Sequence, residues 1–230
     1  MKLGGQLMKK MLATILVLLI IFIGMLIYRT SEKEAEIKID EINKIENYIK
    51  KIYGWKEVSN EALPEFDNIN NADEKWLWGT LRENIDDYEF DYEKIESTAK
   101  EIFGENFNKE YPKAGTEFIS FDEQNGKYQI KGINIDAISD LFLINKIEKN
   151  KDGYVVEIVE YLVDYTNSET GKIRIINTKD EEVYELTEED ATEGNIKKVV
   201  KENMDKFTKK IVKLEKDNDK IFIKSVNLKN

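Results

Sequence analysis

The feature that most constrains this chain is an apolar run near its N-terminus. From Met11 to Tyr28 the sequence is MLATILVLLIIFIGMLIY, which is 18 residues without a charged side chain. An α-helix rises 1.5 Å per residue, so this run would measure about 27 Å, close to the hydrocarbon thickness of a bilayer. A helix also satisfies its own backbone hydrogen bonds, as a segment in lipid must. The run therefore predicts one transmembrane helix over residues 11–28.

The charges on either side of the run predict its orientation. Lys2, Lys9 and Lys10 precede it without any acid, whereas residues 29–40 contain three basic and four acidic side chains. The flank that is richer in Lys and Arg stays in the cytoplasm. We therefore expect residues 1–10 to form a cytoplasmic tail. The rest of the chain after the run would lie outside the cytoplasm, as in a single-pass protein of a bacterial cell membrane.

Two other interpretations of the run compete with an uncleaved signal anchor. A signal peptide usually has 7–15 apolar residues and ends at small ones, but here bulky residues continue from Met25 to Arg29. A core helix of a soluble protein can be apolar on all sides, but at the extreme N-terminus it would have nothing to pack against. We favour the uncleaved anchor and keep cleavage as the alternative.

The composition of the chain excludes several classes of function. It has 46 acidic and 35 basic residues, a net charge of −11, and neither Cys nor His. A nucleic-acid partner would need a clustered basic face. Without Cys and His, the chain lacks thiolate nucleophiles, disulfides, the usual zinc ligands and the commonest general base. We therefore expect no nucleic-acid partner, no metal and no cofactor, and a function that is not enzymatic.

Residues 29–57 are predicted to form a juxtamembrane helix and linker. Apolar residues recur every three or four positions between Ser31 and Tyr53, which indicates an amphipathic helix, and Gly54 is a natural helix end. The apolar stripe consists of Ala35, Ile39, Ile42, Ile45, Ile49 and Ile52. This stripe either packs on the chain's own domain or pairs with a second copy as a short coiled coil. In the second case the protein would be an oligomerising spacer or sensor.

Residues 58–230 are predicted to form an exported domain in which helices come first and strands follow. One helix is expected over 73–81, and a second one follows Asp91 and ends at Gly104. Later in the chain the apolar period changes from 3.6 to 2, which is typical of strands. The expected strands cover 117–121, 127–131, 141–149, 154–165, 172–177, 182–186, 207–214 and 220–226, with a short helix over 194–204. This order predicts an α+β fold with a curved antiparallel sheet.

The order of elements over residues 70–230 resembles that of the cone-shaped folds of the nuclear-transport-factor-like superfamily. A cystatin-like sheet over one helix has almost the same order. Bacteria export such domains on single membrane helices, as in the inner-membrane scaffold proteins of conjugation machines. The resemblance implies a scaffold role in the cell envelope. Because it rests on element order alone, it implies no site residues.

The predicted strand from Tyr154 to Tyr165 contains the candidate for a catalytic residue. Residues 155, 157, 159, 161, 163 and 165 share one face, on which Glu157 is the only charged residue. We expect burial on this face to raise the pKa of Glu157, which would suit acid–base catalysis or binding of a small ligand beside Tyr161. The alternative is that Glu157 lies where the sheet bends or meets solvent, or pairs with a Lys of a neighbouring strand. The opposite face carries Glu160 and Asp164 and is expected to be the wetter one.

Trp76 and Trp78 are the other candidate binding residues. They are two positions apart, so they point to different sides of a helix, and one of them would be available to a partner or to the membrane surface. The alternative is that both lie in the core. Farther along, residues 195–230 are rich in Lys and follow an acidic segment over 180–193. We interpret these lysines as solvated strand faces, although a basic face for anionic polymers or lipid headgroups is the other possibility.

Taken together, these patterns favour a non-enzymatic binding or scaffold module of the cell envelope. Its partner would be another envelope protein or a second copy of the chain. The alternatives are a carboxylate-based enzyme or small-ligand binder around Glu157, and the oligomerising spacer or sensor described above.

Overall fold

The computed structural model describes residues 37–53, 63–132, 138–166, 171–179 and 181–229. Residues Ile37–Asn230 form one compact unit. This unit includes most of the segment that the sequence predicts as a juxtamembrane helix and linker. The apolar run over 11–28 lies outside the described residues. Within the described residues, no helix is both long and apolar enough to cross a bilayer.

The described part of the chain contains four α-helices, close to the positions that the sequence predicts. They are α2 (Ile39–Ile52), α3 (Glu74–Glu83), α4 (Tyr92–Phe103) and α5 (Glu193–Glu202). The side chain of Asp73 accepts a hydrogen bond from the backbone N of Trp76, which caps the start of α3. Gly104 ends α4 with a φ of 92°, a conformation that costs glycine little.

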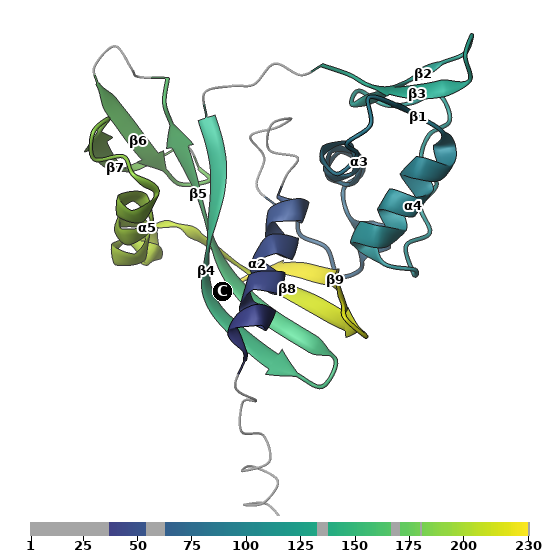
Figure 1. The fold of residues 1–230 in the computed structure, drawn as a ribbon. Coiled ribbons are helices and arrows are strands. Elements are labelled where there is room, and N and C mark those ends of the chain that lie inside the picture. Colours follow the sequence, from purple (N-terminus) through teal and green to yellow (C-terminus); the bar gives the residue numbers. More distant parts are fainter. Residues whose placement is uncertain (1–36, 54–62, 133–137, 167–170, 180, 230) are drawn as a thin grey trace, which may run out of the picture. The chain divides into compact units, whose positions relative to one another are not determined.

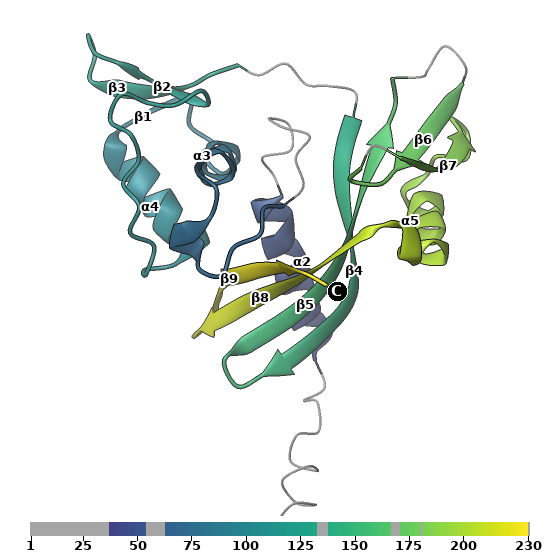
Figure 2. The same ribbon diagram turned by 180° about the vertical axis from the view of Figure 1, so that it is seen from behind.

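The strands form two antiparallel sheets (Figures 1 and 2). The smaller sheet has the order β1-β3-β2 and consists of β1 (Glu89–Phe90), β2 (Ile119–Asp122) and β3 (Lys127–Ile130). In the larger sheet β5 is the central strand: β8 pairs with residues 153–160 of β5, β6 pairs with residues 162–164, and β4 pairs with β5 along its whole length. Beyond them, β7 pairs with β6 and β9 pairs with β8. Its strands are β4 (Ile138–Asn150), β5 (Gly153–Asp164), β6 (Lys172–Ile176), β7 (Glu182–Thr187), β8 (Thr208–Asp217) and β9 (Lys220–Leu228). The predicted α+β class with antiparallel strands is therefore confirmed.

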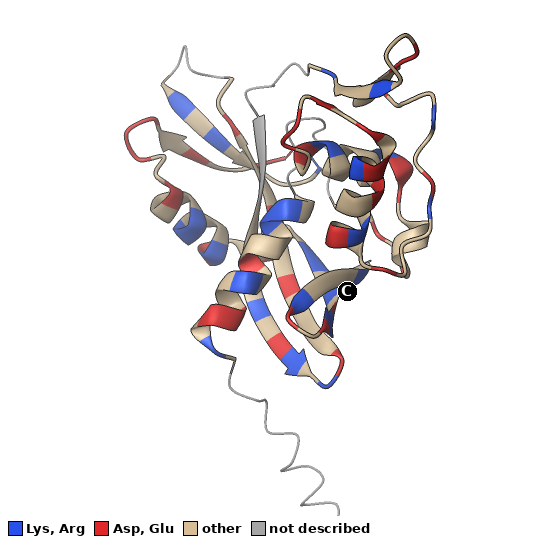
Figure 3. Cartoon of the chain, turned by 45° about the vertical axis from the view of Figure 1, so that its right-hand side comes forward, with Lys and Arg blue, Asp and Glu red and all other residues tan. Residues whose placement is uncertain are grey.

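The apolar stripe of α2 packs inside its own domain. Ile45, Ile49 and Ile52 have no exposed surface, and they contact residues of α3, α4 and the larger sheet in one hydrophobic cluster. The hydroxyl of Tyr48, on the same helix, donates to the backbone O of Ile102 and accepts from the backbone N of Ile223. Figure 3 shows α2 in front of the sheet, with acidic and basic residues along it. For Ile45, Ile49 and Ile52 the structure therefore shows packing on the chain's own domain, whereas Ile39 is 67% exposed and Ala35 lies outside the described residues.

β5 contributes to two separate hydrophobic clusters through opposite faces. Tyr154, Val156 and Ile158 belong to the cluster that contains α2, α3 and α4, whereas Val159 and Tyr161 belong to a second cluster with β6 and α5. The change of face coincides with an irregularity in β4, where the register shifts between Ile144 and Lys146 opposite this part of β5. A bulge of this kind increases the local twist of a sheet.

The expectation of one apolar face along the whole of β5 is therefore wrong. Successive side chains of β5 point to alternate faces, but the face that packs against a hydrophobic cluster changes halfway along the strand. As a result, both faces of β5 contain buried residues, and charged side chains from both faces become enclosed.

Candidate functional site

β5 carries three buried carboxylates. Glu157, Glu160 and Asp164 are 6%, 3% and 1% exposed. Burying an ionised carboxylate is costly unless it gains an opposite charge and hydrogen bonds. For each of the three, the cation comes from a different part of the larger sheet, as described in turn below.

Glu157 is paired with Lys229, which directly follows β9. The Nζ of Lys229 lies 2.5 Å from Oε2 of Glu157, and Asn145 donates to Oε1 over 2.9 Å. The hydrogen bond from Lys229 is the main reason that the pKa of Glu157 lies below its usual range, although burial acts in the opposite direction. The prediction of a raised pKa is therefore wrong, because the buried carboxylate of Glu157 is paired with a lysine, whose effect on the pKa outweighs that of burial. The alternative was a Lys on a neighbouring strand; the partner is a Lys, but it follows β9, which pairs with β8 and not with β5.

Glu160 is the centre of a buried cluster that joins four parts of the chain. The hydroxyl of Tyr53, just after α2, donates to Oε1 over 2.5 Å, and the backbone N of Leu63 donates to the same oxygen over 2.9 Å. The Nζ of Lys210, on β8, is 2.9 Å from Oε2 and also donates to the backbone O of Leu63. The expectation that this face of β5 is the wetter one is wrong for Glu160, because only 3% of this residue is exposed.

Asp164 lies at the end of β5 beside β6. It accepts hydrogen bonds from the backbone N of Thr166 over 2.8 Å and from its hydroxyl over 2.6 Å, and Nε of Arg174 donates over 3.0 Å. Burial alone raises the pKa of Asp164, but the hydrogen bonds from Thr166 and Arg174 outweigh this effect and the pKa is lowered. Asp164 is therefore also enclosed, against the expectation of a wet face.

These pairs have a clear chemical consequence. Glu157 and Asp164 have lowered pKa values, so they are ionised at neutral pH and already bound to a cation. A general acid or base needs a pKa near the working pH and access to a proton of the substrate. The arrangement is better suited to holding the strands of the larger sheet together than to proton transfer.

The structure places the remaining candidates in the interior. Trp76 is buried, and its Nε1 donates to the backbone O of Ile52 over 3.2 Å. Trp78 is also buried and packs edge-on against Tyr111. Both indoles therefore lie in the core of the domain. Tyr161 shares a face of β5 with Glu157 but packs in the second hydrophobic cluster, so the four candidates do not form one site.

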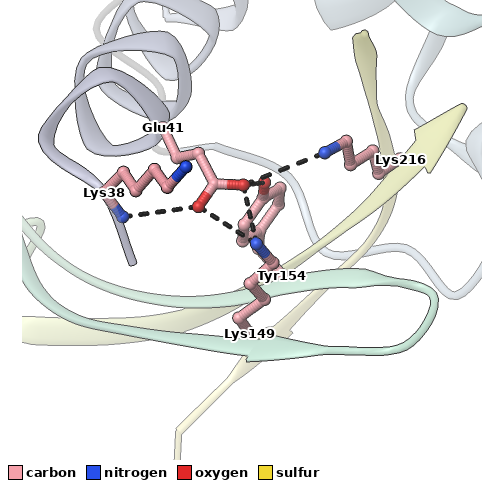
Figure 4. Close-up of polar contacts among 5 residues, drawn as sticks. All are labelled: Lys38, Glu41, Lys149, Tyr154 and Lys216. Atoms are coloured by element: carbon pink, nitrogen blue, oxygen red, sulfur yellow. Dashed lines mark hydrogen bonds and ion pairs between the residues drawn. The ribbon is translucent and has the colours of Figure 1, made fainter. Parts of the chain in front are cut away.

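A further polar cluster, which the sequence analysis missed, lies at the start of α2 (Figure 4). We call it the Glu41 cluster; it consists of Glu41, Lys149, Tyr154 and Lys216. The two carboxylate oxygens of Glu41 lie 2.7 and 3.0 Å from Nζ of Lys149, on β4. The hydroxyl of Tyr154, on β5, donates to Oε1 over 2.9 Å, and Nζ of Lys216, on β8, lies 3.8 Å from the same oxygen. One carboxylate on the first turn of α2 thus contacts three strands.

Electrostatics in the Glu41 cluster strongly favour the ionised carboxylate. The hydrogen bonds from Lys149 and then from Tyr154 lower the pKa of Glu41 to about 2. Burial, together with the hydrogen bond to Glu41, raises the pKa of Tyr154 to about 12, so this hydroxyl remains a donor at neutral pH. The only sequence signal for this cluster is an acid in the first turn of an amphipathic helix. An acid is favourable there in any helix, because the N-terminal end of the helix dipole is positive.

Within the described residues, no group of three or more acidic side chains is arranged to hold a metal ion. No protein-family model, no curated protein and no solved structure matches this chain.

Proposed function

We propose that the chain is a single-pass membrane protein whose domain serves, outside the cytoplasm, as a non-enzymatic binding or scaffold module of the cell envelope. The observation that supports this proposal is the uncharged run over 11–28. The ten residues before it contain three lysines and no acidic residue. The order of elements, which resembles exported cone-shaped domains of scaffold proteins, agrees with this role.

The position of α2 limits where such a module would work. Because α2 is part of the domain core, the link between Tyr28 and the first helical residue, Ile39, is ten residues long. Fully extended, this link spans at most about 34 Å. The domain would therefore meet partners close to the membrane surface, such as the exposed parts of other membrane-bound envelope proteins.

The paired carboxylates support a non-enzymatic role. The enzyme alternative depended on a raised pKa at Glu157, and that group instead has a lowered pKa and a bound lysine. The coiled-coil alternative depended on an apolar stripe that is available along the helix, but Ile45, Ile49 and Ile52 are buried inside the domain and only Ile39 of the described stripe residues is largely exposed. We therefore propose neither of these alternatives.

The proposal is tested by crosslinking in the native cell. The full chain carries an affinity tag at its C-terminus, and crosslinked complexes are purified from membranes and identified. The matched control places a cleavable small-residue site in residues 25–28, which releases the same domain from the membrane. We expect a reproducible set of membrane-proximal envelope proteins that is lost in the control. Purification of the chain alone, with no partner and no second copy, would contradict the proposal.

A further inference from the structure

The first turn of α2 is attached to the sheet differently from the rest of the helix. Ile39 is 67% exposed, and Ile45 is the first residue of α2 that has no exposed surface. Between them, Glu41 supplies the hydrogen bonds and ion pairs that join the helix to β4, β5 and β8 (Figure 4). The start of α2 is thus joined to the sheet by the polar contacts of Glu41, with Ile42 only partly buried, whereas its later turns are held by apolar packing.

The strength of this attachment follows from the geometry. Glu41 and Lys149 are both partly shielded from water, with side chains that are 18% and 28% exposed, and both carboxylate oxygens are within hydrogen-bond distance of the ammonium. Hydrogen bonds between charged groups that are shielded in this way are stronger than those of exposed ion pairs.

We propose that the Glu41 cluster limits how far the domain extends from the membrane. This inference rests on the proposed anchor over 11–28. With the cluster formed, the link to the first helical residue is ten residues and at most about 34 Å. With the cluster broken, the first turns of α2 unwind as far as Ile45, and the link becomes 16 residues, at most about 54 Å.

Hydrogen–deuterium exchange on the full chain in lipid nanodiscs tests whether the cluster holds the helix start. The backbone amides of residues 42–45 are the relevant ones, because they donate to carbonyls of the first turn. We expect Glu41→Gln to speed their exchange by about 10- to 100-fold, the usual range for hydrogen bonds to a charged group. Amides of residues 49–52, which donate to carbonyls from Ile45 onward, keep wild-type rates. Tyr154→Phe, which removes one donor from the sheet, has a smaller effect on the same amides.

Asp40→Asn is the matched control. It removes the same charge from the neighbouring residue, whose side chain is exposed, and we expect it to leave the exchange of residues 42–45 unchanged. Wild-type exchange in Glu41→Gln would overturn the inference. Equal acceleration over the whole of α2 would also overturn it, since Glu41 would then stabilise the domain in general.

The change in reach is measured by energy transfer from a dye on the domain to acceptor lipids in the nanodisc. The chain has no Cys, so Ser97→Cys, at an exposed position of α4, provides one labelling site. We expect lower transfer efficiency when Glu41→Gln is added and no change with Asp40→Asn. Equal transfer efficiency in the Glu41→Gln and Asp40→Asn variants would overturn the proposal that the Glu41 cluster limits how far the domain extends. The exchange experiment reports on the cluster whether or not residues 11–28 span a bilayer, so its failure is distinct from failure of the proposed anchor.

Discussion

At the scale of single residues, Glu41 shows how a partly shielded carboxylate links folding to pH. Its pKa is about 2 in the folded chain, because Lys149 and Tyr154 donate to the ionised form. In an unfolded chain, a Glu has a pKa of about 4.3. As the pH falls, Glu41 is therefore protonated in the unfolded state before it is protonated in the folded state. This difference lowers the free energy of unfolding.

The sign of the resulting pH dependence is therefore fixed. The stabilisation that Glu41 contributes is fully present above about pH 4.3 and declines as the pH falls toward 2. We expect the difference in free energy of unfolding between the wild type and Glu41→Gln to be larger at pH 7 than at pH 3. Urea unfolding in mild detergent, followed by tryptophan fluorescence, measures it. A difference that is the same at both pH values would contradict this prediction.

Glu157 shows what the sequence can and cannot predict about a residue. The strand pattern indicated that this carboxylate is enclosed, and it is. Its partner, Lys229, lies 72 residues farther along the chain. The distance between two such groups depends on how β8 and β9 pair, and the local periodicity of the sequence does not show which strands pair. The direction of the pKa shift follows from that partner, so the sequence alone predicted it with the wrong sign.

At the scale of elements, the buried ion pairs help to fix the register of the larger sheet. A slip of one residue would turn every side chain of a strand to the opposite face. In β5 such a slip would separate Glu160 from Lys210 and Asp164 from Arg174. Each of these pairs therefore disfavours the wrong register, in addition to any stability that it contributes.

We expect Lys210→Met to destabilise the domain strongly, because it leaves the carboxylate of Glu160 buried without a cation. Breaking one side of a buried ion pair costs about 3–5 kcal/mol. Adding Glu160→Gln should recover a large part of this loss. Lys213→Met, at an exposed position of the same strand, is the matched control. Urea unfolding that shows equal stabilities for Lys210→Met and Lys213→Met would rule out the assigned role of the pair.

The positions of helices and strands were largely predictable because they depend on local period and on turn residues. The helix between Asp91 and Gly104 and the hairpin around Asn125-Gly126 are examples, and the structure confirms both. The bulge in β4 and the change of covered face in β5 were not predictable in this way. They arise from how two distant clusters pack on one strand, and no local pattern distinguishes that arrangement from a simple two-faced strand.

At the scale of the whole molecule, the main result is that the compact unit begins at Ile37 and includes α2. The amphipathic pattern of α2 predicted a buried face but not which surface buries it. Packing on the domain core, rather than on a second copy, shortens the link to the predicted membrane helix.

The most direct measurement is the sidedness of single introduced cysteines in the native cell. Because the chain has no Cys, Ser97→Cys in the domain and Gln6→Cys in the N-terminal tail each give one reactive thiol. A maleimide that does not cross membranes is added to wall-stripped cells before or after permeabilisation. We predict that Cys at position 97 is labelled in intact cells and that Cys at position 6 is labelled only after permeabilisation. Labelling of position 97 only after permeabilisation would contradict an anchored domain outside the cytoplasm.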